Sequence, residues 1–323
     1  MEVAVADRGE GAEVKVGLID VDGHHFPNLA LMRISAWHKA QGDEVEWWWS
    51  DLMHYDVVYM SKIFSDAYSP DVPEPMNADR VIKGGTGYCI TLGDDGKEHF
   101  DRNKNTELPA EMEQMFPDYS IYPQHEFAVS MTSRGCPRAC EFCVVAAKEG
   151  RASRKVADVS QFWAGQPLIE VLDPNITACK DKRDLMGQYR ETGAWIDFTQ
   201  GLDIRMLDEA DINDLNGMKI KMIHFAWDNP QDDLVDRLRL FSEKFKIKDH
   251  RRKTVYILTN FGSTIEQDLH RIYTVRDLGY SPYVMIYNKP DAPQEVRYLQ
   301  RWCNNKIIFR TVPDFYDYDP KIG

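Results

Sequence analysis

The order of apolar and polar runs in residues 126–310 most constrains the fold of this chain. Six short apolar runs recur there, each followed by a polar turn and then by a stretch with helical spacing. They lie at 127–131, 168–172, 195–199, 222–226, 255–259 and 283–287. Strands that alternate with helices form parallel sheets. Eight such units close a barrel, so six predict an open, partial (βα)6 TIM-like barrel over 126–323, with an extra strand at 306–309.

A similar alternation precedes this region. Apolar runs at 14–21, 44–49, 56–64 and 80–83 predict four strands. A helix is expected over 29–41, where Asn28 can cap its start and Gly42 follows its end. This pattern predicts a small doubly wound parallel-sheet domain over 14–88, so the fold class is α/β with two domains.

Two segments are predicted to lie outside these domains. Residues 1–13 are small, acidic and glycine-containing, so we expect a disordered lead-in. Residues 89–125 are rich in charged residues, Asn and Pro, so we expect a surface linker.

Composition excludes several classes of protein. Asp and Glu total 52 against 39 Lys and Arg, a formal net charge of −13, which disfavours broad binding to nucleic acid or anionic lipid. No apolar run approaches the roughly 18 residues that span a bilayer, and no signal peptide is visible. Six cysteines are too few for a disulfide framework in 323 residues. We therefore expect a cytoplasmic protein without a membrane partner.

Three cysteines lie together in the loop that follows the first predicted barrel strand. They are Cys136, Cys140 and Cys143, in a CxxxCxxC spacing. Three thiolates on one loop can hold three corners of a [4Fe-4S] cluster and leave one iron open to a small molecule. A structural zinc site needs a fourth ligand, and no Cys or His follows at a short spacing. The other three cysteines are scattered, which indicates core or spare thiols: Cys89, Cys179 and Cys303.

The cysteine spacing, with the aromatic Phe142 directly before Cys143, resembles the motif of the radical S-adenosylmethionine (radical SAM) superfamily. The resemblance covers about 126–310, and the six predicted units agree with that family's partial barrel. It implies that the three cysteines bind a [4Fe-4S] cluster whose open iron chelates SAM. One-electron reduction would split SAM into methionine and a 5′-deoxyadenosyl radical, which abstracts hydrogen from a substrate that the sequence does not identify. It also implies a reductant protein such as flavodoxin or ferredoxin.

Polar residues follow the other predicted strands. The resemblance implies that such groups bind SAM, and our candidates beside Phe142 are Asp173, Gln200, Arg205 and Asp228. Carboxylates and amides suit the SAM ammonium and ribose diol, and Arg suits its carboxylate. We expect these four side chains to share one pocket with the cysteine loop. The alternative is that they cap loops and turns. The family's glycine-rich stretch after the second strand is replaced here by Asp173-Pro-Asn175.

The N-terminal region weakly resembles a cobalamin-binding-type domain. His24 and His25 follow the first strand, and Gly84-Gly85 could let a nucleotide tail approach, but Pro27 stands where that pattern has Gly. We favour the structural interpretation, in which the histidines are solvated and the glycines form a turn. The basic run 244–253 is likewise interpreted as a solvated helix end rather than a contact for RNA or a phosphate-bearing substrate.

Three functions therefore remain open. The favoured one is a radical SAM enzyme that works without cobalamin. The alternatives are a cobalamin-dependent radical SAM methyltransferase and a non-catalytic iron–sulfur binding module.

Overall fold

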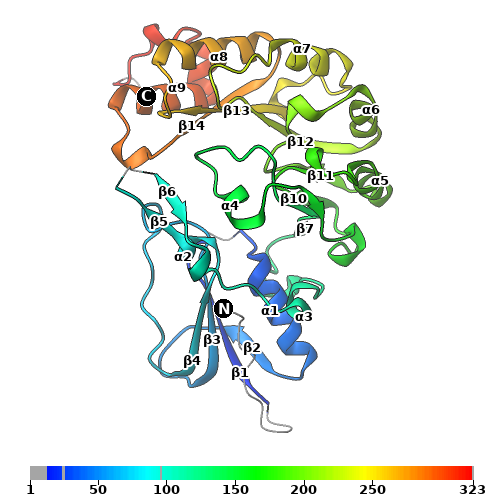
Figure 1. Cartoon of the computed structure of the whole chain (residues 1–323), viewed down its shortest axis with the longest axis vertical. Helices are drawn as coiled ribbons and strands as arrows, with labels where there is room; N and C mark the ends of the chain where they lie inside the picture. The colour runs from blue at the N-terminus through cyan, green and yellow to red at the C-terminus, as the bar shows by residue number, and fades with distance from the viewer. Residues whose placement is uncertain (1–12, 24–25, 95–96, 322–323) are drawn as a thin grey trace. The chain divides into compact units, whose positions relative to one another are not determined.

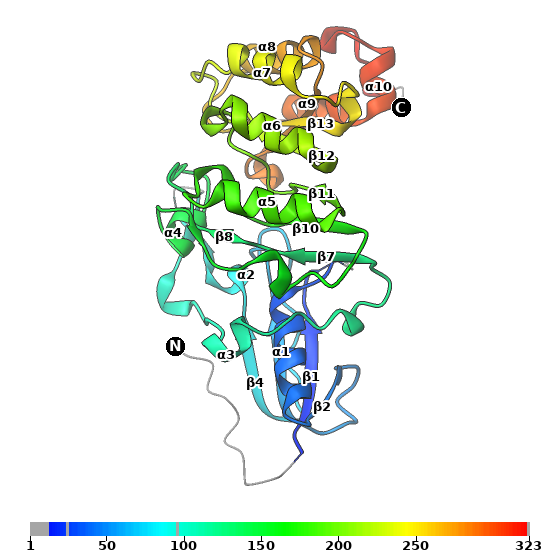
Figure 2. The ribbon, with the colours of Figure 1, turned by 90° about the vertical axis from the view of Figure 1, so that its right-hand side faces the viewer.

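The computed structural model describes residues 13–23, 26–94 and 97–321 (Figures 1 and 2). The chain divides into two compact units, and each is described here by itself. Unit 1 comprises 1–129 with 160–164, and unit 2 comprises 130–159 with 165–323. The predicted disordered lead-in lies almost entirely outside the described residues. Among the helices that the structure describes, none is both long enough and apolar enough to cross a membrane.

Unit 1 is built on a four-stranded parallel sheet in the order β2-β1-β3-β4. The strands are β1 (Lys15–Asp20), β2 (Glu44–Trp47), β3 (Tyr55–Ser61) and β4 (Ala78–Gly84). Helix α1 (Leu29–Ala40) begins as expected at Asn28, whose Oδ1 accepts from the Leu31 amide at 3.3 Å. Its buried Leu31 and Ile34 pack with Val16 and Leu18 of β1, so one face of the sheet forms the core of the unit.

Helices do not flank both faces of this sheet as a doubly wound domain requires. The order 2-1-3-4 does reverse direction between β1 and β3. However, the connections at 48–54 and 62–77, all within the described residues, carry no helix. The second of them contains Pro70, Pro73 and Pro75, which interrupt helical hydrogen bonding. The expected strand order is therefore present, and the expected helices on the second face are not.

The predicted linker is part of unit 1. It holds short elements: α2 (Thr86–Cys89), β5 (Ile90–Leu92), β6 (Glu98–Phe100), η1 (Arg102–Lys104), α3 (Ala110–Glu113) and η2 (Tyr119–Ile121). Met112 of α3 is fully buried in the core under α1. Arg33 of α1 donates to Glu113 at 2.8 Å, and Ser35 donates to Asp118 at 2.7 Å. These few apolar anchors, spread among charged residues, join the segment predicted as a linker to the core of unit 1.

A six-stranded sheet has the order β14-β13-β12-β11-β10-β7. Strands β10 to β14 belong to unit 2, and every neighbouring pair among these five is parallel. The strands are β7 (Phe127–Ser130), β10 (Leu168–Val171), β11 (Trp195–Asp197), β12 (Lys219–Ala226), β13 (Lys253–Thr259) and β14 (Ser281–Ile286). All six coincide with the predicted apolar runs. The chain is therefore an α/β protein with parallel sheets.

Helices connect the strands and bury one face of this sheet. They are α5 (Lys182–Thr192), α6 (Glu209–Gly217), α7 (Val235–Lys244), α8 (Ile265–Asp277) and α9 (Gln294–Asn304). Figure 2 shows α5, α6, α7 and α8 in succession beside the strands. Phe225 of β12 meets Phe241 of α7 edge-on, with ring centroids 4.8 Å apart. The polar residues of this sheet therefore lie on its opposite face and at the ends of its strands.

The expected strand at 306–309 is a helix, α10 (Lys306–Thr311). The Asn305 side chain caps it by accepting from the amides of Ile307 and Ile308 at 3.1 and 3.2 Å. A short apolar run such as Lys-Ile-Ile-Phe does not distinguish strand from helix by itself. Here the Asn305 cap favours the helix.

Candidate functional site

The cysteine loop is held between two short antiparallel strands, β8 (Ser133–Arg134) and β9 (Arg154–Lys155), with α4 (Val145–Glu149) between them. Gly135 has φ +90, and a Cβ there would lie 2.2 Å from the Ala152 carbonyl oxygen. Only glycine allows this close approach. The Cys136 amide then donates to Gly150 O at 3.2 Å, and the Cys143 amide donates to Cys140 O at 3.0 Å. The backbone thus fixes where the cysteines lie.

The three thiols influence one another but do not converge on a point. Burial raises the pKa of Cys140, and the Asp228 charge adds to this. Burial also raises the pKa of Cys143, with Cys140 and Cys136 adding to it. All three cysteines are described residues, and their sulfurs do not all lie within 4.8 Å of one another. A tetrahedral zinc ion would hold thiolates about 3.8 Å apart, as follows from its bond lengths.

Asp173, at the end of β10, supports the start of this loop. One carboxylate oxygen accepts from the Thr132 amide at 2.8 Å. The other accepts from the Thr132 hydroxyl at 2.9 Å and from the Ser133 amide and hydroxyl at 2.5 and 2.6 Å. Asp173 is only 2% exposed. Burial raises the pKa of its carboxyl to about 6, although the hydrogen bonds from Ser133 and Thr132 lower it. The structure therefore ties Asp173 to the loop rather than pointing it into an open pocket.

Asn175 reaches the first cysteine. Its Nδ2 donates to the Cys136 sulfur at 3.4 Å. Its Oδ1 accepts from the Thr177 hydroxyl at 2.6 Å and from the Ala178 amide at 3.2 Å, which caps η4 (Ile176–Ala178). Because the oxygen is committed to these donors, the amide nitrogen must face the sulfur. Sequence reasoning noted Asn175 only as part of a turn after the second barrel strand, and its place there was the available signal.

A pocket of about 390 Å³ opens beside the loop. Cys140 and Phe142 line it from the loop, and Arg205 and Asp228 line it from the segments after β11 and β12. Phe142 packs edge-on against Phe261, which follows β13, with centroids 5.5 Å apart. The structure thus brings four of the sequence candidates into one place, and the volume suits a small organic ligand.

Charged groups crowd this pocket. The Arg205 guanidinium donates to Asp203 at 2.7 Å and to Asp232 at 2.6 Å. The Arg138 guanidinium lies 3.8 Å from Asp203 and 3.7 Å from Asp232. Burial alone would lower the pKa of Arg205, but the two carboxylates raise it. Arg138 was missed as a site residue, although its position inside the cysteine motif could have suggested it.

The Asp228 carboxyl lines the same pocket, and hydrogen bonds from Arg271 hold the turn that carries it. Burial raises its pKa to about 6, and the Arg205 and Arg271 charges act against this. Arg271 of α8 is nearly inaccessible and donates to the carbonyl oxygens of Trp227 and Asp228 at 2.6 and 2.9 Å. Its carboxylate partner Asp268 accepts at 2.5 Å. No sequence pattern marked Arg271, because its role depends on where α8 packs.

Gln200 lies apart from the cysteine pocket. It follows β11 and lines a different cavity of unit 2, together with Thr199 and Tyr256. The expectation of one shared pocket therefore describes Arg205 and Asp228 but not Gln200 or the buried Asp173.

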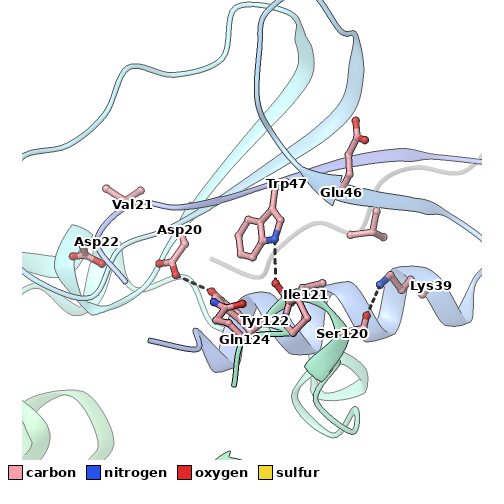
Figure 3. Close-up of a pocket in the computed structure, with 12 residues that line it drawn as sticks. Asp20, Val21, Asp22, Lys39, Glu46, Trp47, Ser120, Ile121, Tyr122 and Gln124 are labelled. Carbon is pink, nitrogen blue, oxygen red and sulfur yellow. Dashed lines mark hydrogen bonds between the residues drawn. The ribbon is translucent and has the colours of Figure 1, made fainter. Parts of the chain in front are cut away.

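Unit 1 has a pocket of its own, of about 720 Å³ (Figure 3). Three carboxylates and one ammonium line it: Asp20, Asp22, Glu46 and Lys39. The Tyr122 hydroxyl donates to Asp20 at 2.7 Å, and the Trp47 indole donates to the Ile121 carbonyl oxygen at 3.1 Å, as Figure 3 shows. The predominance of carboxylates makes this pocket unsuited to a phosphate.

Two features of the N-terminal region resemble a cobalamin site: the histidine pair and the glycine pair. His24 and His25 lie outside the described residues. Gly85 has φ +102, and a Cβ there would lie 2.2 Å from the Lys62 carbonyl oxygen. This glycine is therefore required by the packing of unit 1 itself.

Comparison with known proteins gives a likeness of fold. Neither a family model nor a curated protein matches the chain. Among solved structures, it is similar to the radical SAM methyltransferase TsrM from Kitasatospora setae with cobalamin and a [4Fe-4S] cluster bound. The TM-score is 0.59 at 12% identity, over 85% of this chain and 72% of that one. TsrM with tryptophan substrate and the SAM analogue aza-SAM is similar at a TM-score of 0.58 and 11% identity, over 84% and 72%. The chain thus has the fold of this radical SAM methyltransferase.

Proposed function

We propose that this protein is a radical SAM enzyme that cleaves SAM reductively to begin hydrogen abstraction from a substrate. The observation that carries the proposal is the three-cysteine loop, which lies beside a pocket lined by Phe142, Arg205 and Asp228. Within this proposal the six-stranded sheet is a partial (βα)6 TIM-like barrel, and the pocket lies at the carboxyl ends of its strands, where barrel enzymes carry their active sites.

The residues present fit a [4Fe-4S] cluster. Cys136, Cys140 and Cys143 would hold it, since three soft thiolate donors on one loop suit a cubane with one free iron. The cluster would supply the electron that divides SAM into methionine and a 5′-deoxyadenosyl radical. We further propose that the electron comes from a flavodoxin- or ferredoxin-like protein in the cytoplasm.

The chain's own residues would position SAM and exclude water. Arg205 and Arg138 present guanidinium groups suited to the methionine carboxylate, and Asp228 suits its ammonium. Phe142, held by Phe261, walls the pocket beside the loop. Asp173 holds Thr132 and Ser133 so that the loop enters at a fixed angle. Gln200 would contact SAM only if the ligand extends beyond the cysteine pocket.

Reductive SAM cleavage tests the proposal. Anaerobically reconstituted protein is incubated with SAM and dithionite, and the small molecules are separated by chromatography. Slow release of 5′-deoxyadenosine and methionine is expected even without substrate. A fully loaded, reduced protein that releases neither, and whose electron paramagnetic resonance spectrum ignores SAM, would favour the non-catalytic iron–sulfur module.

Arg205→Ala is expected to weaken SAM binding about ten- to hundredfold while the cluster stays loaded. A charge-assisted contact to a carboxylate contributes roughly 1.5–3 kcal/mol, and Arg205 is on a different segment from the cysteines. Equilibrium dialysis with labelled SAM measures the affinity. Arg239→Ala is the control, because the exposed Asp236 on α7 is the only described residue with which Arg239 forms an ion pair. Equal affinities in the two variants would remove Arg205 from the site.

Asn175→Asp is expected to lower the midpoint potential of the loaded cluster. Asp keeps an oxygen to accept from Thr177 and Ala178, but it replaces the donor to the Cys136 sulfur by a negative oxygen. Hydrogen bonds to cluster sulfur raise the potential, and negative charge lowers it. A dithionite titration followed by electron paramagnetic resonance gives the value. Ser153→Ala is the matched control, since the Ser153 hydroxyl donates to the Asn175 carbonyl oxygen and to no other atom in the described part of the chain. An unchanged potential in Asn175→Asp would contradict the assignment.

A cobalamin-dependent methyltransferase is the second candidate, because the likeness to cobalamin-bound TsrM extends over 85% of the chain. The acidic pocket of unit 1 and the packing role of Gly85 do not favour it. Hydroxocobalamin added to the purified protein separates the candidates. Stoichiometric retention on gel filtration, with a shifted corrin spectrum, would support the methyltransferase.

A further inference from the structure

A second cavity of unit 2, of about 1500 Å³, lies along the face of the sheet that the connecting helices do not cover. Alternate residues of three adjacent strands line it: Met222 and His224, Thr254 and Tyr256, and Tyr283 and Met285. Their neighbours in sequence, such as Phe225, Val255 and Val284, are fully buried on the other face. Because side chains alternate between the two faces of a strand, one face of the sheet packs into the apolar core and the other presents polar and aromatic side chains to the cavity.

A carboxylate, an imidazole and a phenol follow one another across this wall. Asp197 Oδ1 lies 3.2 Å from His224 Nε2, and His224 Nδ1 lies 3.0 Å from the Tyr256 hydroxyl. The His224 and Tyr256 rings stack with an interplanar angle of 6°. Asp197 and His224 are buried, whereas Tyr256 is half-buried and reaches the cavity.

The direction of these hydrogen bonds follows from their chemistry. A carboxylate only accepts, so the His224 proton is on Nε2 and Nδ1 is an acceptor. The single proton of the Tyr256 hydroxyl has two acceptors in reach, Nδ1 at 3.0 Å and the Thr199 carbonyl oxygen at 3.4 Å, and the shorter contact assigns it to Nδ1. Behind Asp197, the Lys221 ammonium lies 3.5 Å from its second oxygen and 2.9 Å from Glu170. Tyr283 of β14 meets the Tyr256 ring edge-on at 5.8 Å. Burial raises the pKa of Tyr256 to about 12, and Asp197 adds to this, so the phenol is neutral at rest.

The rest of the lining indicates which ligand the cavity takes. Aromatic rings of Tyr256, Tyr283 and Phe309 offer flat apolar surface. Five cationic side chains line it against one carboxylate, Asp249: Lys248, Arg251, Arg276, Lys306 and Arg310. Arg251 is paired with Asp249 and Arg276 with Asp277, whereas Arg310 makes no ion pair with any residue that the structure describes. This excess of positive charge is local, because the chain as a whole carries −13.

We propose that this cavity binds an aromatic anion and that Tyr256, His224 and Asp197 relay a proton from it. The ligand's acidic X–H bond breaks as its proton passes to the Tyr256 oxygen. The Tyr256 proton passes at the same time to His224 Nδ1. The ligand gains one negative charge, and His224 becomes an imidazolium paired with the Asp197 carboxylate, so atoms and charge balance. Tyr256 touches the ligand, and His224 and Asp197 act through it.

This inference goes beyond the proposed function and does not rest on it, because the cavity shares no lining residue with the cysteine pocket. Binding and proton transfer require neither the cluster nor SAM. The two can therefore fail independently.

The probe is 4-hydroxy-3-nitrophenylacetate, an aromatic carboxylate whose phenol changes colour when it ionises. Calorimetry with the purified full chain is expected to show binding that Arg310→Glu weakens about fivefold, the size of a partly exposed charge contact. Arg239→Glu, a charge reversal on α7 away from the cavity lining, is the control and should bind like the wild type. Absence of binding, or equal affinity in both variants, would overturn the ligand assignment.

Absorbance of the bound probe tests the relay. On wild-type protein the phenol is expected to ionise at lower pH than in free solution, because the relay accepts its proton. Tyr256→Phe and His224→Gln should bind the probe within about twofold yet lose this shift. Tyr283→Phe, which keeps the cavity and leaves the relay intact, should retain it. A shift that survives Tyr256→Phe, or that Tyr283→Phe abolishes equally, would overturn the relay.

Discussion

Replacing Cys136, Cys140 and Cys143 together by Ala is expected to remove all bound iron and sulfide from anaerobically reconstituted protein. Each thiolate supplies one metal bond, and the described loop offers no other soft ligand to replace it. The brown colour and the broad charge-transfer absorption should disappear, and with them the release of 5′-deoxyadenosine. Iron and sulfide analysis, beside the absorption spectrum, measures the effect.

The matched control replaces the other cysteines. Cys89, Cys179 and Cys303 are buried, and the Cys303 thiol contacts the Pro282 carbonyl oxygen at 3.7 Å. Their replacement by Ala should cost about 1 kcal/mol each in packing and leave the iron content unchanged. Full iron and sulfide in the first triple variant, or their loss in the second, would show that the ligands are assigned wrongly.

Asp173→Ala is expected to lower the free energy of unfolding by roughly 3–5 kcal/mol, because it leaves the buried amides of Thr132 and Ser133 without an acceptor. Urea unfolding followed by fluorescence measures it. The same change should reduce cluster loading, since the segment that leads to Cys136 loses its anchor. This double effect distinguishes Asp173 from a residue that merely contacts SAM.

Two further variants, a conservative change at Asp173 and a control at an exposed carboxylate, test whether the loss of stability comes from the lost acceptor. Asp173→Asn keeps one acceptor oxygen and should lose less than half as much stability as Asp173→Ala. Asp236→Ala removes a carboxylate that is 89% exposed and that forms an ion pair with Arg239 alone among the residues the structure describes. It should change stability by no more than about 0.5 kcal/mol. Unfolding of Asp173→Ala at the wild-type urea concentration, with full cluster loading, would refute the anchoring role.

Much of the fold could be predicted because strand positions follow local patterns. The six apolar runs of unit 2 and the Asn28 cap of α1 lie where the sequence placed them, since a strand or a cap depends on neighbouring residues. The burial of Met112 in the segment 89–125 had no such local signal, because it depends on α1 lying against it. The helix at 306–311 was missed although its cap, Asn305, is the residue directly before it.

By itself, the sequence determined that three thiols at short spacing follow a strand in a chain of βα units, because covalent proximity alone keeps Cys136, Cys140 and Cys143 on one loop. Tertiary structure alone decided which distant residues meet that loop. The Asp173 carboxylate accepts from Ser133 instead of facing a ligand, and Gln200 lines the cavity of Tyr256 instead of the cysteine pocket. The Asn175 amide donates to the Cys136 sulfur. Tertiary structure also aligned Asp197, His224 and Tyr256 from three strands. Such contacts depend on strand register and on the direction of each side chain, which no local pattern specifies.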